Sequence, residues 1–305
     1  MTSHTKRRLF DRCRKSLAAA GIAVPEQAIL CPLCWQQKLL DELTVDHVVS
    51  ESLGGKKTTL TCCRCNNTYG SSLESDLQAL HKACRFWKGG QQLAGELRIE
   101  QDRAAVKVQR GSSGSGMHVK VVAKASNPAQ ITSMEHRVQS GEVQQLQLRL
   151  SYGYKSQRAI IALVRCAYLA LFRCFGYEYA CDRFVQELRK AMANSVSARA
   201  QEGERYETSL VLLKPLVVGL SDCNWPFSCA YVIAPGRLAW KDKHQGADFF
   251  FVLFRWPSSI GDTRYGVFMP QPGQSEEAFL GPLRQAAAEH ASVRLGPVPV
   301  GLLFC

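Results

Sequence analysis

Hydrophobic and polar positions along the N-terminal part of the chain follow helical and strand periods in turn. Residues 6–20 carry apolar side chains at helical spacing and predict a helix with one apolar face. Residues 43–49 are apolar and β-branched, and residues 58–61 can return as a second strand after a turn. From Ser71 to Trp87 apolar residues recur every three or four positions, so a helix is expected to start near Ser71.

The rest of the chain alternates between strand and helix patterns. Residues 96–108 and 117–123 predict two strands, joined by a glycine- and serine-rich linker at residues 111–116 that suits a hairpin tip. The other predicted strands are residues 144–150, 209–220, 228–234, 247–256, 265–269 and 298–304. The other predicted helices are residues 154–179, 182–193 and 276–290. Mixed elements of this kind predict an α+β fold.

The most apolar stretch, residues 159–172, lies inside the predicted helix 154–179. Arg165 interrupts it, and it falls short of the roughly 20 apolar residues that cross a bilayer, so we expect no membrane span. Arg158, Arg165 and Arg173 follow one another at about two helical turns, which places them on one face of the helix. We therefore expect an amphipathic helix of a soluble protein.

The overall charge adds a candidate partner. The chain has 305 residues, 46% hydrophobic and 21% charged, which is ordinary globular composition and excludes wholesale disorder. Its formal net charge of +12 favours polyanionic partners, such as nucleic acid or an anionic membrane face. Six Lys or Arg residues in the helix at residues 6–20 either form a solvated face or contact phosphates.

The thirteen cysteines point to a metal site. The first fifteen residues are charged throughout and lack the apolar core of a secretory signal, so we expect a cytoplasmic, reducing location. Two Cys-x-x-Cys turns, Cys31 with Cys34 and Cys62 with Cys65, together offer the four thiolates of a structural zinc ion. Cys63 is the extra thiol, because only Cys62 and Cys65 have the two-residue spacing. The alternatives are unligated core cysteines and thiol redox chemistry.

Four residues between the cysteine turns have catalytic or binding potential. Asp46 and His47 are adjacent in the first predicted strand, and Lys56 and Lys57 follow the turn. Taken alone, His47 is a candidate for a buried, hydrogen-bonded histidine and Asp46 for an edge or turn residue. The two lysines either belong to a solvated turn or contact the phosphate backbone of a nucleic acid.

The segment after the second cysteine turn offers further polar side chains. Asn66 and Asn67 either terminate the turn or supply an oxygen ligand to a metal ion. Glu74 stands three residues after Ser71 and forms the pattern of a capping box at the start of the predicted helix. The pattern favours a local role of Glu74 in helix capping over a role near the metal ion.

Taken together, these motifs resemble the HNH endonuclease superfamily. The resemblance rests on the two cysteine turns, the Asp46-His47 pair, the Gly54-Gly55 turn and the Cys65-Asn66-Asn67 sequence, with Gly70 and Glu74 downstream. It covers about residues 29–88, under a third of the chain. It implies a ββα-metal fold with a zinc knuckle and one catalytic divalent cation, Mg or Mn. In this resemblance His47 corresponds to the general base, while Asp46 and Asn66 correspond to ligands of the catalytic ion.

Two features of the hairpin bear on this resemblance. The middle Asn of the family pattern is missing, since no Asn occurs in residues 48–61, and Thr58 or Thr59 stands nearest to its place. Neighbouring residues of a strand point to opposite faces. Asp46 and His47 can therefore face one phosphate only if the strand ends or bulges between them.

These observations predict a metal-dependent endonuclease that hydrolyses phosphodiester bonds of nucleic acid, with DNA as the preferred substrate. The alternative from another class is a zinc-stabilised nucleic-acid-binding module without catalysis. Residues 1–90 form the predicted nuclease domain, including the basic helix. Residues 91–305 form a mixed α/β region of unknown fold, for which substrate recognition or regulation is the expected role.

Overall fold

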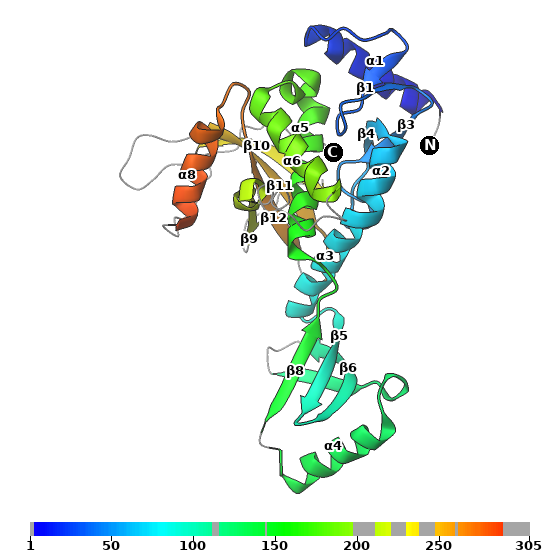
Figure 1. Ribbon diagram of the computed structural model, residues 1–305, viewed down its shortest axis with the longest axis vertical. Helices are drawn as coiled ribbons and strands as arrows, with labels where there is room; N and C mark the ends of the chain where they lie inside the picture. The colour runs from blue at the N-terminus through cyan, green and yellow to red at the C-terminus, as the bar shows by residue number, and fades with distance from the viewer. Residues whose placement is uncertain are drawn as a thin grey trace. The chain divides into compact units, whose positions relative to one another are not determined.

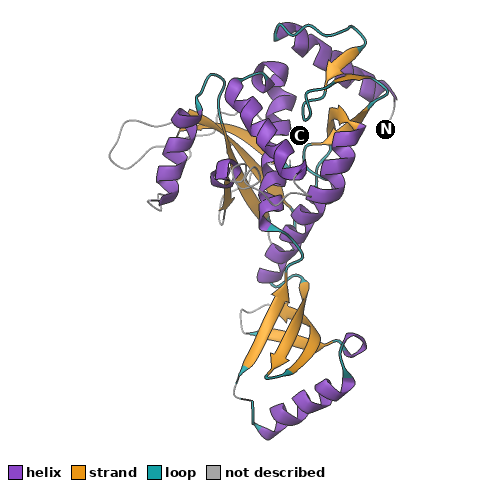
Figure 2. Cartoon of the chain, in the orientation of Figure 1, coloured by secondary structure: helices purple, strands orange, loops and turns teal. Residues whose placement is uncertain are grey.

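The fold combines helices and sheets, so the predicted α+β class is confirmed (Figures 1 and 2). It is described from a computed structural model that covers residues 3–111, 116–143, 145–197, 211–220, 230–237, 248–259 and 262–288. The first of two compact units comprises Met1–Leu77, Lys155–Trp256 and Arg264–Cys305. The second comprises Gln78–Tyr154 and Pro257–Thr263. This grouping differs from the expected boundary near residue 90, because later helices belong to the same unit as the cysteine turns.

The N-terminal part of the first unit contains one helix, two short hairpins and a second, composite helix. The elements are α1 (Ser3–Ala19), β1 (Ala28–Leu30), β2 (Gln37–Leu39), β3 (Leu43–His47), the 3₁₀ turn η1 (Glu51–Leu53) and β4 (Lys57–Cys62). They continue into α2 (Cys63–Tyr69), the π-helical turn η2 (Gly70–Glu74) and α3 (Ser75–Trp87), of which the part from Gln78 onward belongs to the second unit. Strands β1 and β2 form one antiparallel pair, and β3 and β4 form another.

The composite helix begins at Cys63, so the prediction of a helix start near Ser71 is wrong. The Cys62 thiolate accepts a hydrogen bond from the backbone N–H of Cys65, and Cys62 is thereby the N-cap. A thiol at this position satisfies a free N–H of the first turn. The capping box of Ser71 and Glu74 is also contradicted, because residues 70–74 lie inside the helix as a π turn.

The glycine pair between β3 and β4 is required by close backbone approach. Gly54 has φ of 88°, the left-handed conformation that glycine adopts most readily, and ends the 3₁₀ turn. A Cβ atom at Gly55 would lie 1.6 Å from the carbonyl oxygen of Val49. The turn therefore packs directly onto the end of the segment that carries Asp46 and His47.

Helix α5 (Ser156–Ala180) runs through the core of the first unit beside α6 (Arg183–Ser197). Residues 161–172 are buried without a break, so the predicted amphipathic helix with an exposed face is wrong. The arginine stripe points at protein partners instead of solvent. Arg158 pairs with Asp76 at 2.8 Å, Arg165 pairs with Asp46 at 2.6 Å, and Arg173 donates to the Tyr231 hydroxyl at 2.8 Å.

Among the described helices, α5 is long and apolar enough to cross a membrane by length and composition. Its most apolar window has a mean hydropathy of 1.8, and 72% of that window is buried inside the protein. The core helix of a globular unit meets the same test, and the burial of α5 agrees with that role.

A four-stranded antiparallel sheet completes the first unit, in the order β10-β11-β12-β9. Its strands and flanking elements are η5 (Lys214–Leu216), β9 (Val217–Leu220), β10 (Tyr231–Arg237), β11 (Asp248–Trp256), β12 (Thr263–Met269) and α8 (Glu276–Ala288). The strands at 228–234, 247–256 and 265–269 and the helix at 276–290 are confirmed within the described residues. The pattern at 209–220 is wrong in its first half, where a helical turn precedes β9. The predicted strand 298–304 lies outside the described residues.

The second unit is a four-stranded antiparallel sheet in the order β7-β6-β5-β8, packed against α4 and against Phe86 of α3. Its elements are β5 (Gln92–Ile99), β6 (Asp102–Arg110), β7 (Met117–Val121), η3 (Ala123–Ala125), α4 (Pro128–Ser140) and β8 (Leu146–Ser151). The single strand predicted at 96–108 is wrong, because the chain turns at Glu100, whose φ is 52°. Helix α4 was not predicted. The hairpin of β6 and β7 is present, and residues 112–115 of its predicted tip lie outside the described residues.

Candidate metal centre and active site

The two cysteine turns meet in one cluster, as their spacing predicted. The sulfur atoms of Cys31, Cys34, Cys62 and Cys65 all lie within 4.8 Å of one another. Ligands of a tetrahedral zinc ion at about 2.3 Å from the metal lie about 3.8 Å apart. The Cys34 and Cys62 sulfurs are 3.8 Å apart, so the four thiols fit a structural zinc ion. Cys63 is exposed and outside the cluster.

Hydrogen bonds within the cluster shift the pKa values of its thiols. Hydrogen bonding with Cys31 lowers the pKa of the Cys34 and Cys62 thiols, while the same contacts raise the pKa of Cys31. Backbone N–H groups also point at sulfur, since the N–H of Cys62 donates to the Cys31 sulfur at 3.3 Å. Thiolates are the form that binds zinc, and N–H donors of this kind stabilise them.

The first cysteine turn is held from outside by α5 and α6. The Tyr168 hydroxyl donates to the Pro32 carbonyl at 2.7 Å, and Arg189 donates to the Leu33 carbonyl at 3.2 Å. Tyr177 donates to the carbonyl of Leu30. These donors satisfy buried carbonyl groups of the turn, which would otherwise cost free energy. The zinc knuckle and the α5–α6 pair therefore form one packed structure.

A bulge interrupts the β3–β4 hairpin between Asp46 and His47. This is the irregularity that the two residues need in order to face one phosphate. Asp46 is opposite Thr59, whereas His47 is opposite Lys57, so Thr58 is the extra residue. A bulge of this kind re-aims the side chains beside it. The expected irregularity of the backbone is confirmed.

The bulge does not bring Asp46 and His47 to the same surface. Asp46 is 1% exposed and accepts hydrogen bonds on both carboxylate oxygens. One oxygen accepts from the His47 backbone N–H at 2.7 Å, and the other from the Thr61 hydroxyl at 2.9 Å and from Arg165 at 2.6 Å. Thr61 thus holds Asp46 from the strand in which the family pattern has its middle Asn.

An open cavity of about 480 Å³ lies on the other side of the hairpin. It is lined by Thr44, Val45, His47, Lys57, Asn66, Asn67, Gly70 and Glu74. Of the predicted site residues, the structure gathers His47, Asn66 and Lys57 here. Asp46 and Lys56 are not among the lining residues, and Lys56 is exposed in the turn.

The environment of His47 favours a neutral imidazole at pH 7. Partial burial, together with the charge of Lys57, lowers the pKa of His47 below its ordinary value, and Arg165 acts in the same direction. Asp46 and Glu51 oppose this shift, and the Glu51 carboxylate lies 3.7 Å from Nε2 of His47. A neutral imidazole that lines an open cavity can accept a proton from a bound water.

Glu74 is a cavity residue that the sequence pattern assigned to a helix cap. Asn66, Gly70 and Glu74 follow one another at four-residue intervals through α2 and η2, so they share one side of the composite helix. Burial raises the pKa of Glu74. The sequence could not show that Glu74 lines the cavity, because the π turn that places it there leaves no periodic sequence pattern. Turns of this kind recur at functional sites.

The cavity residues fit a hard divalent cation. Glu74 offers a carboxylate and Asn66 an amide oxygen, the ligand types that Mg²⁺ and Mn²⁺ prefer. Both line the cavity beside His47, which leaves the remaining positions around an ion to water or substrate oxygens. The prediction of Asp46 as a ligand stays a prediction, and this carboxylate has protein donors on both oxygens.

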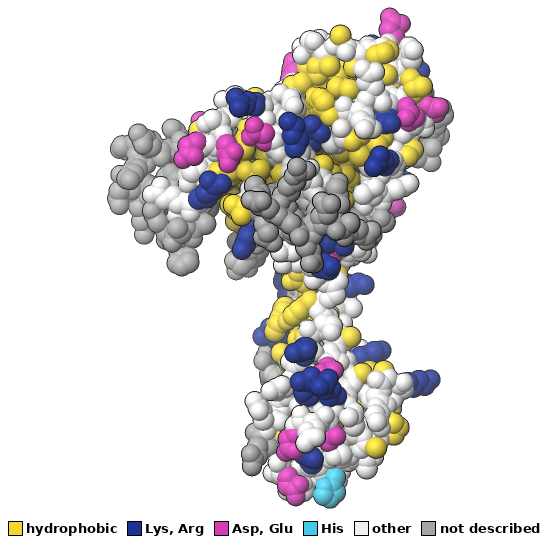
Figure 3. Space-filling view, in the orientation of Figure 1, with side chains coloured by type: hydrophobic (Ala, Val, Ile, Leu, Met, Phe, Trp, Pro, Cys, Tyr) yellow, Lys and Arg dark blue, Asp and Glu magenta, His cyan; other side chains and the backbone are white. Residues whose placement is uncertain are grey.

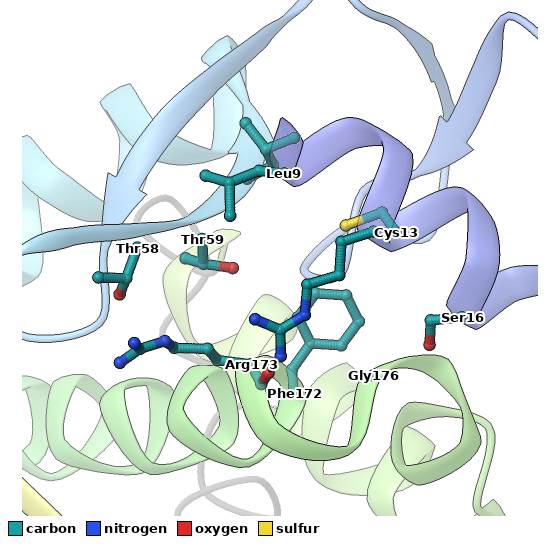
Figure 4. A pocket seen from close by; sticks show the side chains of 10 residues that line it. Leu9, Cys13, Ser16, Thr58, Thr59, Phe172, Arg173 and Gly176 are labelled. Atoms are coloured by element: carbon teal, nitrogen blue, oxygen red, sulfur yellow. Dashed lines mark hydrogen bonds between the residues drawn. The ribbon is translucent and has the colours of Figure 1, made fainter. Parts of the chain in front are cut away.

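A second cavity lies behind the hairpin, where α1, β4 and α5 meet (Figure 4). Its volume is about 30 Å³, the space of one water, and its surface is mostly apolar. Leu9, Cys13 and Phe172 lie around it, and Arg12 of α1 donates to the carbonyl of Arg173. It is a packing gap beneath the bulge and offers no set of catalytic groups.

The basic helix α1 is partly explained by its packing. Arg14 donates to three backbone carbonyls, of Val24, Pro25 and Ala28, and so fixes the loop that leads into β1. Arg7 pairs with Asp11 on an exposed surface. With Arg12, which donates to the Arg173 carbonyl, three of the six basic residues have protein partners, and phosphate contact by the others stays a prediction.

Comparison with known proteins agrees with the cysteine cluster and the hairpin. Residues 31–80 match a family model described as HNH endonuclease. The match covers both cysteine turns, the β3–β4 pair and the composite helix as far as the cavity residues. No curated protein and no solved structure matches the chain.

Proposed function

Because residues 31–80 match the HNH endonuclease family, we propose that this chain is a metal-dependent endonuclease that hydrolyses phosphodiester bonds, with DNA as its substrate. The observation that carries the proposal is the cavity in which His47, Asn66, Glu74 and Lys57 meet beside the four-cysteine cluster. The zinc ion has a structural role in this proposal. The catalytic ion is Mg²⁺ or Mn²⁺, held by Asn66 and Glu74.

The chain's own residues supply the other parts of the reaction. His47 accepts a proton from the water that attacks phosphorus, and its lowered pKa keeps it in the neutral form that can do so. Lys57 places a positive charge in the cavity and attracts the phosphate. A divalent cation bound there would stabilise the charge that develops on the phosphate and on the leaving 3′ oxygen. The expected products are a 5′-phosphate and a 3′-hydroxyl.

A zinc-stabilised nucleic-acid-binding module without catalysis is the second candidate. One observation favours it, namely that Asp46 is buried against Arg165 and Thr61 and does not line the cavity. A nuclease then depends on a cation held by Asn66 and Glu74. Both candidates need the four cysteines, whereas only the first needs His47 and an added divalent ion.

The test is cleavage of supercoiled plasmid by the zinc-loaded chain with Mg²⁺ or Mn²⁺. We expect wild type to nick or linearise the plasmid and His47→Ala to be slower by about two to four orders of magnitude, the contribution of a general base. His136→Ala is the matched control, because His136 is an exposed histidine of α4 in the second unit. It should cleave like wild type.

The two candidates give different results in this assay. If wild type, His47→Ala and His136→Ala are equally inert across metals and across DNA and RNA substrates while still binding nucleic acid, the binding module is correct. If the two histidine variants lose activity equally, the role of His47 is contradicted.

A further inference from the structure

The sheet of the second unit has one apolar face and one polar face. On the apolar face, Phe86 of α3 packs against Val106 and Val108, and Met134 of α4 packs against Ile99 and Ala104. Both helices therefore cover the same side of the sheet. Within the described residues, no helix or strand covers the opposite side.

Strand register shows which side chains share the uncovered side. Lys107 is opposite Lys120 across β6 and β7, and Arg103 is opposite Arg98 across β5 and β6. Arg149 is opposite Glu96 across β5 and β8. Arg98, Arg103 and Lys107 alternate with buried apolar residues of β5 and β6, so they point away from the covered side. The pairing of strands β5 to β8 places Glu96, Lys120 and Arg149 on this same side.

We call these six residues, Arg98, Arg103, Lys107, Lys120, Arg149 and Glu96, the basic face. Five are positively charged, and Glu96 is the one acidic member, 3.4 Å from the Nε atom of Arg98. Four of the five basic residues are exposed, and Arg98 is partly buried. Lys and Arg side chains stand over the strands of this unit in Figure 3.

Like charges directly opposite each other on a sheet are destabilising. Lys107 opposite Lys120 and Arg103 opposite Arg98 are therefore unfavourable for the sheet alone. An anionic partner would offset this repulsion. The net positive charge of the face matches the phosphate backbone of a nucleic acid.

The residue types on the face favour a duplex over a single strand. Proteins that bind single strands on a sheet stack bases on aromatic side chains. The described strands carry no Phe, Tyr or Trp on this side, and its centre has the small residues Ala94 and Ala105.

We propose that the basic face of the second unit binds the phosphate backbone of double-stranded DNA. This surface is separate in sequence from the cavity at His47 and acts without base-specific contacts. It rests on the proposed function only in the choice of nucleic acid as the partner. It also supplies a concrete role for part of the region that follows residue 90.

The test measures binding of a fluorescent DNA duplex to the zinc-loaded chain as a function of salt. The His47→Ala background without added Mg²⁺ or Mn²⁺ separates binding from cleavage. Lys107→Gln with Lys120→Gln should weaken binding at least about tenfold at 0.1 M salt and lower the salt slope by about 2, because each phosphate contact contributes about 0.9. Lys107→Arg with Lys120→Arg keeps the charge and should bind like the parent.

The matched control is Lys82→Gln with Lys124→Gln, which removes the same charge from two exposed lysines of the second unit outside the basic face. It should leave the salt slope close to that of the parent. Equal losses in the two glutamine pairs would overturn the proposal, as would a loss that appears with single-stranded DNA or duplex RNA but not with duplex DNA. Inactivity of the wild-type chain in plasmid cleavage would not affect it.

Discussion

Asp46 and Arg165 are the two buried charges next to the candidate active site. Their atoms are 2.6 Å apart, and both side chains are almost fully buried, at 0% and 4% exposure. Removing one partner of a buried ion pair leaves an uncompensated charge, which costs far more than the pair contributes in place. The pair connects the β3–β4 hairpin to α5 and positions the strand that carries His47.

Replacing Arg165 should destabilise the first unit strongly. We expect Arg165→Met to lower the free energy of unfolding by about 3 kcal/mol, because Asp46 is left buried without its cation. The double variant with Asp46→Asn should regain a large part of that loss. Denaturant unfolding monitored by circular dichroism measures both.

Arg183→Met is the control for this experiment, since the Arg183 side chain is 96% exposed. Its effect should stay within about 0.5 kcal/mol. Arg165→Met with a stability equal to that of Arg183→Met would contradict the anchoring role of the ion pair.

The pH dependence of cleavage should follow the lowered pKa of His47. A general base is active when neutral, so the rate should fall as pH drops through that pKa, below the ordinary value of 6.5. Burial, Lys57 and Arg165 lower the pKa, and Asp46 and Glu51 raise it. Single-turnover rates between pH 5 and pH 8 measure the acidic limb.

Variants of two neighbouring lysines distinguish a specific effect on the pKa of His47 from a general effect of charge on the cleavage rate. Lys57→Gln removes a charge that lowers the pKa of His47, so the acidic limb should move to higher pH. Lys56→Gln should leave the limb in place, because Lys56 does not line the cavity. Identical limbs in the two variants would contradict the assignment of His47 as the base.

At the residue scale, the sequence predicted types of chemistry better than directions of side chains. The meeting of the four cysteines in one cluster could be predicted because the spacing within each turn is local. His47 and Asn66 line one cavity, and their catalytic roles stay predictions. The orientation of the Asp46 side chain could not be predicted, because its partner Arg165 is far away in the sequence. Glu74 was assigned to a helix cap because the π turn that aims it at the cavity has no periodic pattern.

The element that organises the site is the helix that starts at the second cysteine turn. Cys62 caps it, Cys65 lies in its first turn, and Asn66 and Glu74 follow along it. Zinc binding would therefore fix the start of the helix that supplies the cavity residues. Metal binding and local folding are linked in this arrangement, as in small zinc-dependent domains.

Two adjacent cysteines offer a matched test of this linkage. Cys62→Ser should lower the zinc content from one per chain to far below one and expose the module to proteolysis, since zinc contributes on the order of 10 kcal/mol in small finger peptides. Cys63→Ser should keep one zinc per chain, because the Cys63 thiol is exposed and outside the cluster. Loss of zinc in both variants, or in neither, would contradict the assigned ligands.

Element types were predicted better than element boundaries. β-branched, apolar composition predicted the β3–β4 hairpin. Alternation predicted strands of the second unit, because half-buried strands show a period of two. The turn at Glu100 was hidden, since it lacks glycine, proline or asparagine and interrupts a continuous alternating run. Helix α4 had sequence signals at both ends, an Asn127-Pro128 start and Gly141 as its left-handed cap.

At the scale of the whole molecule, the candidate nuclease module is part of a larger packed unit. The same compact unit contains the cysteine turns and α5 and α6, although about eighty residues of the second unit separate them in sequence. Sequence alone could not show this, because contacts between distant segments leave no local pattern. Arg165, Tyr168 and Arg189 are among the residues that join the two parts.

A fragment of residues 1–90 should therefore bind zinc but lack a stable tertiary structure. It loses the donors to the carbonyls of Pro32 and Leu33 and the cation that pairs with Asp46. We expect a broad thermal transition and rapid amide exchange across β3 and β4, compared with the full chain in the same buffer. A cooperative transition at the melting temperature of the full chain would contradict this dependence.

The central claim is that the cavity beside the cysteine cluster seats a divalent cation next to His47. Anomalous diffraction from crystals of the zinc-loaded chain soaked in Mn²⁺ tests it most directly. The account predicts one manganese peak in the cavity, bound by Asn66 and Glu74, in addition to the zinc peak among the four cysteines. A zinc peak with no manganese in the cavity at saturating Mn²⁺ would contradict it.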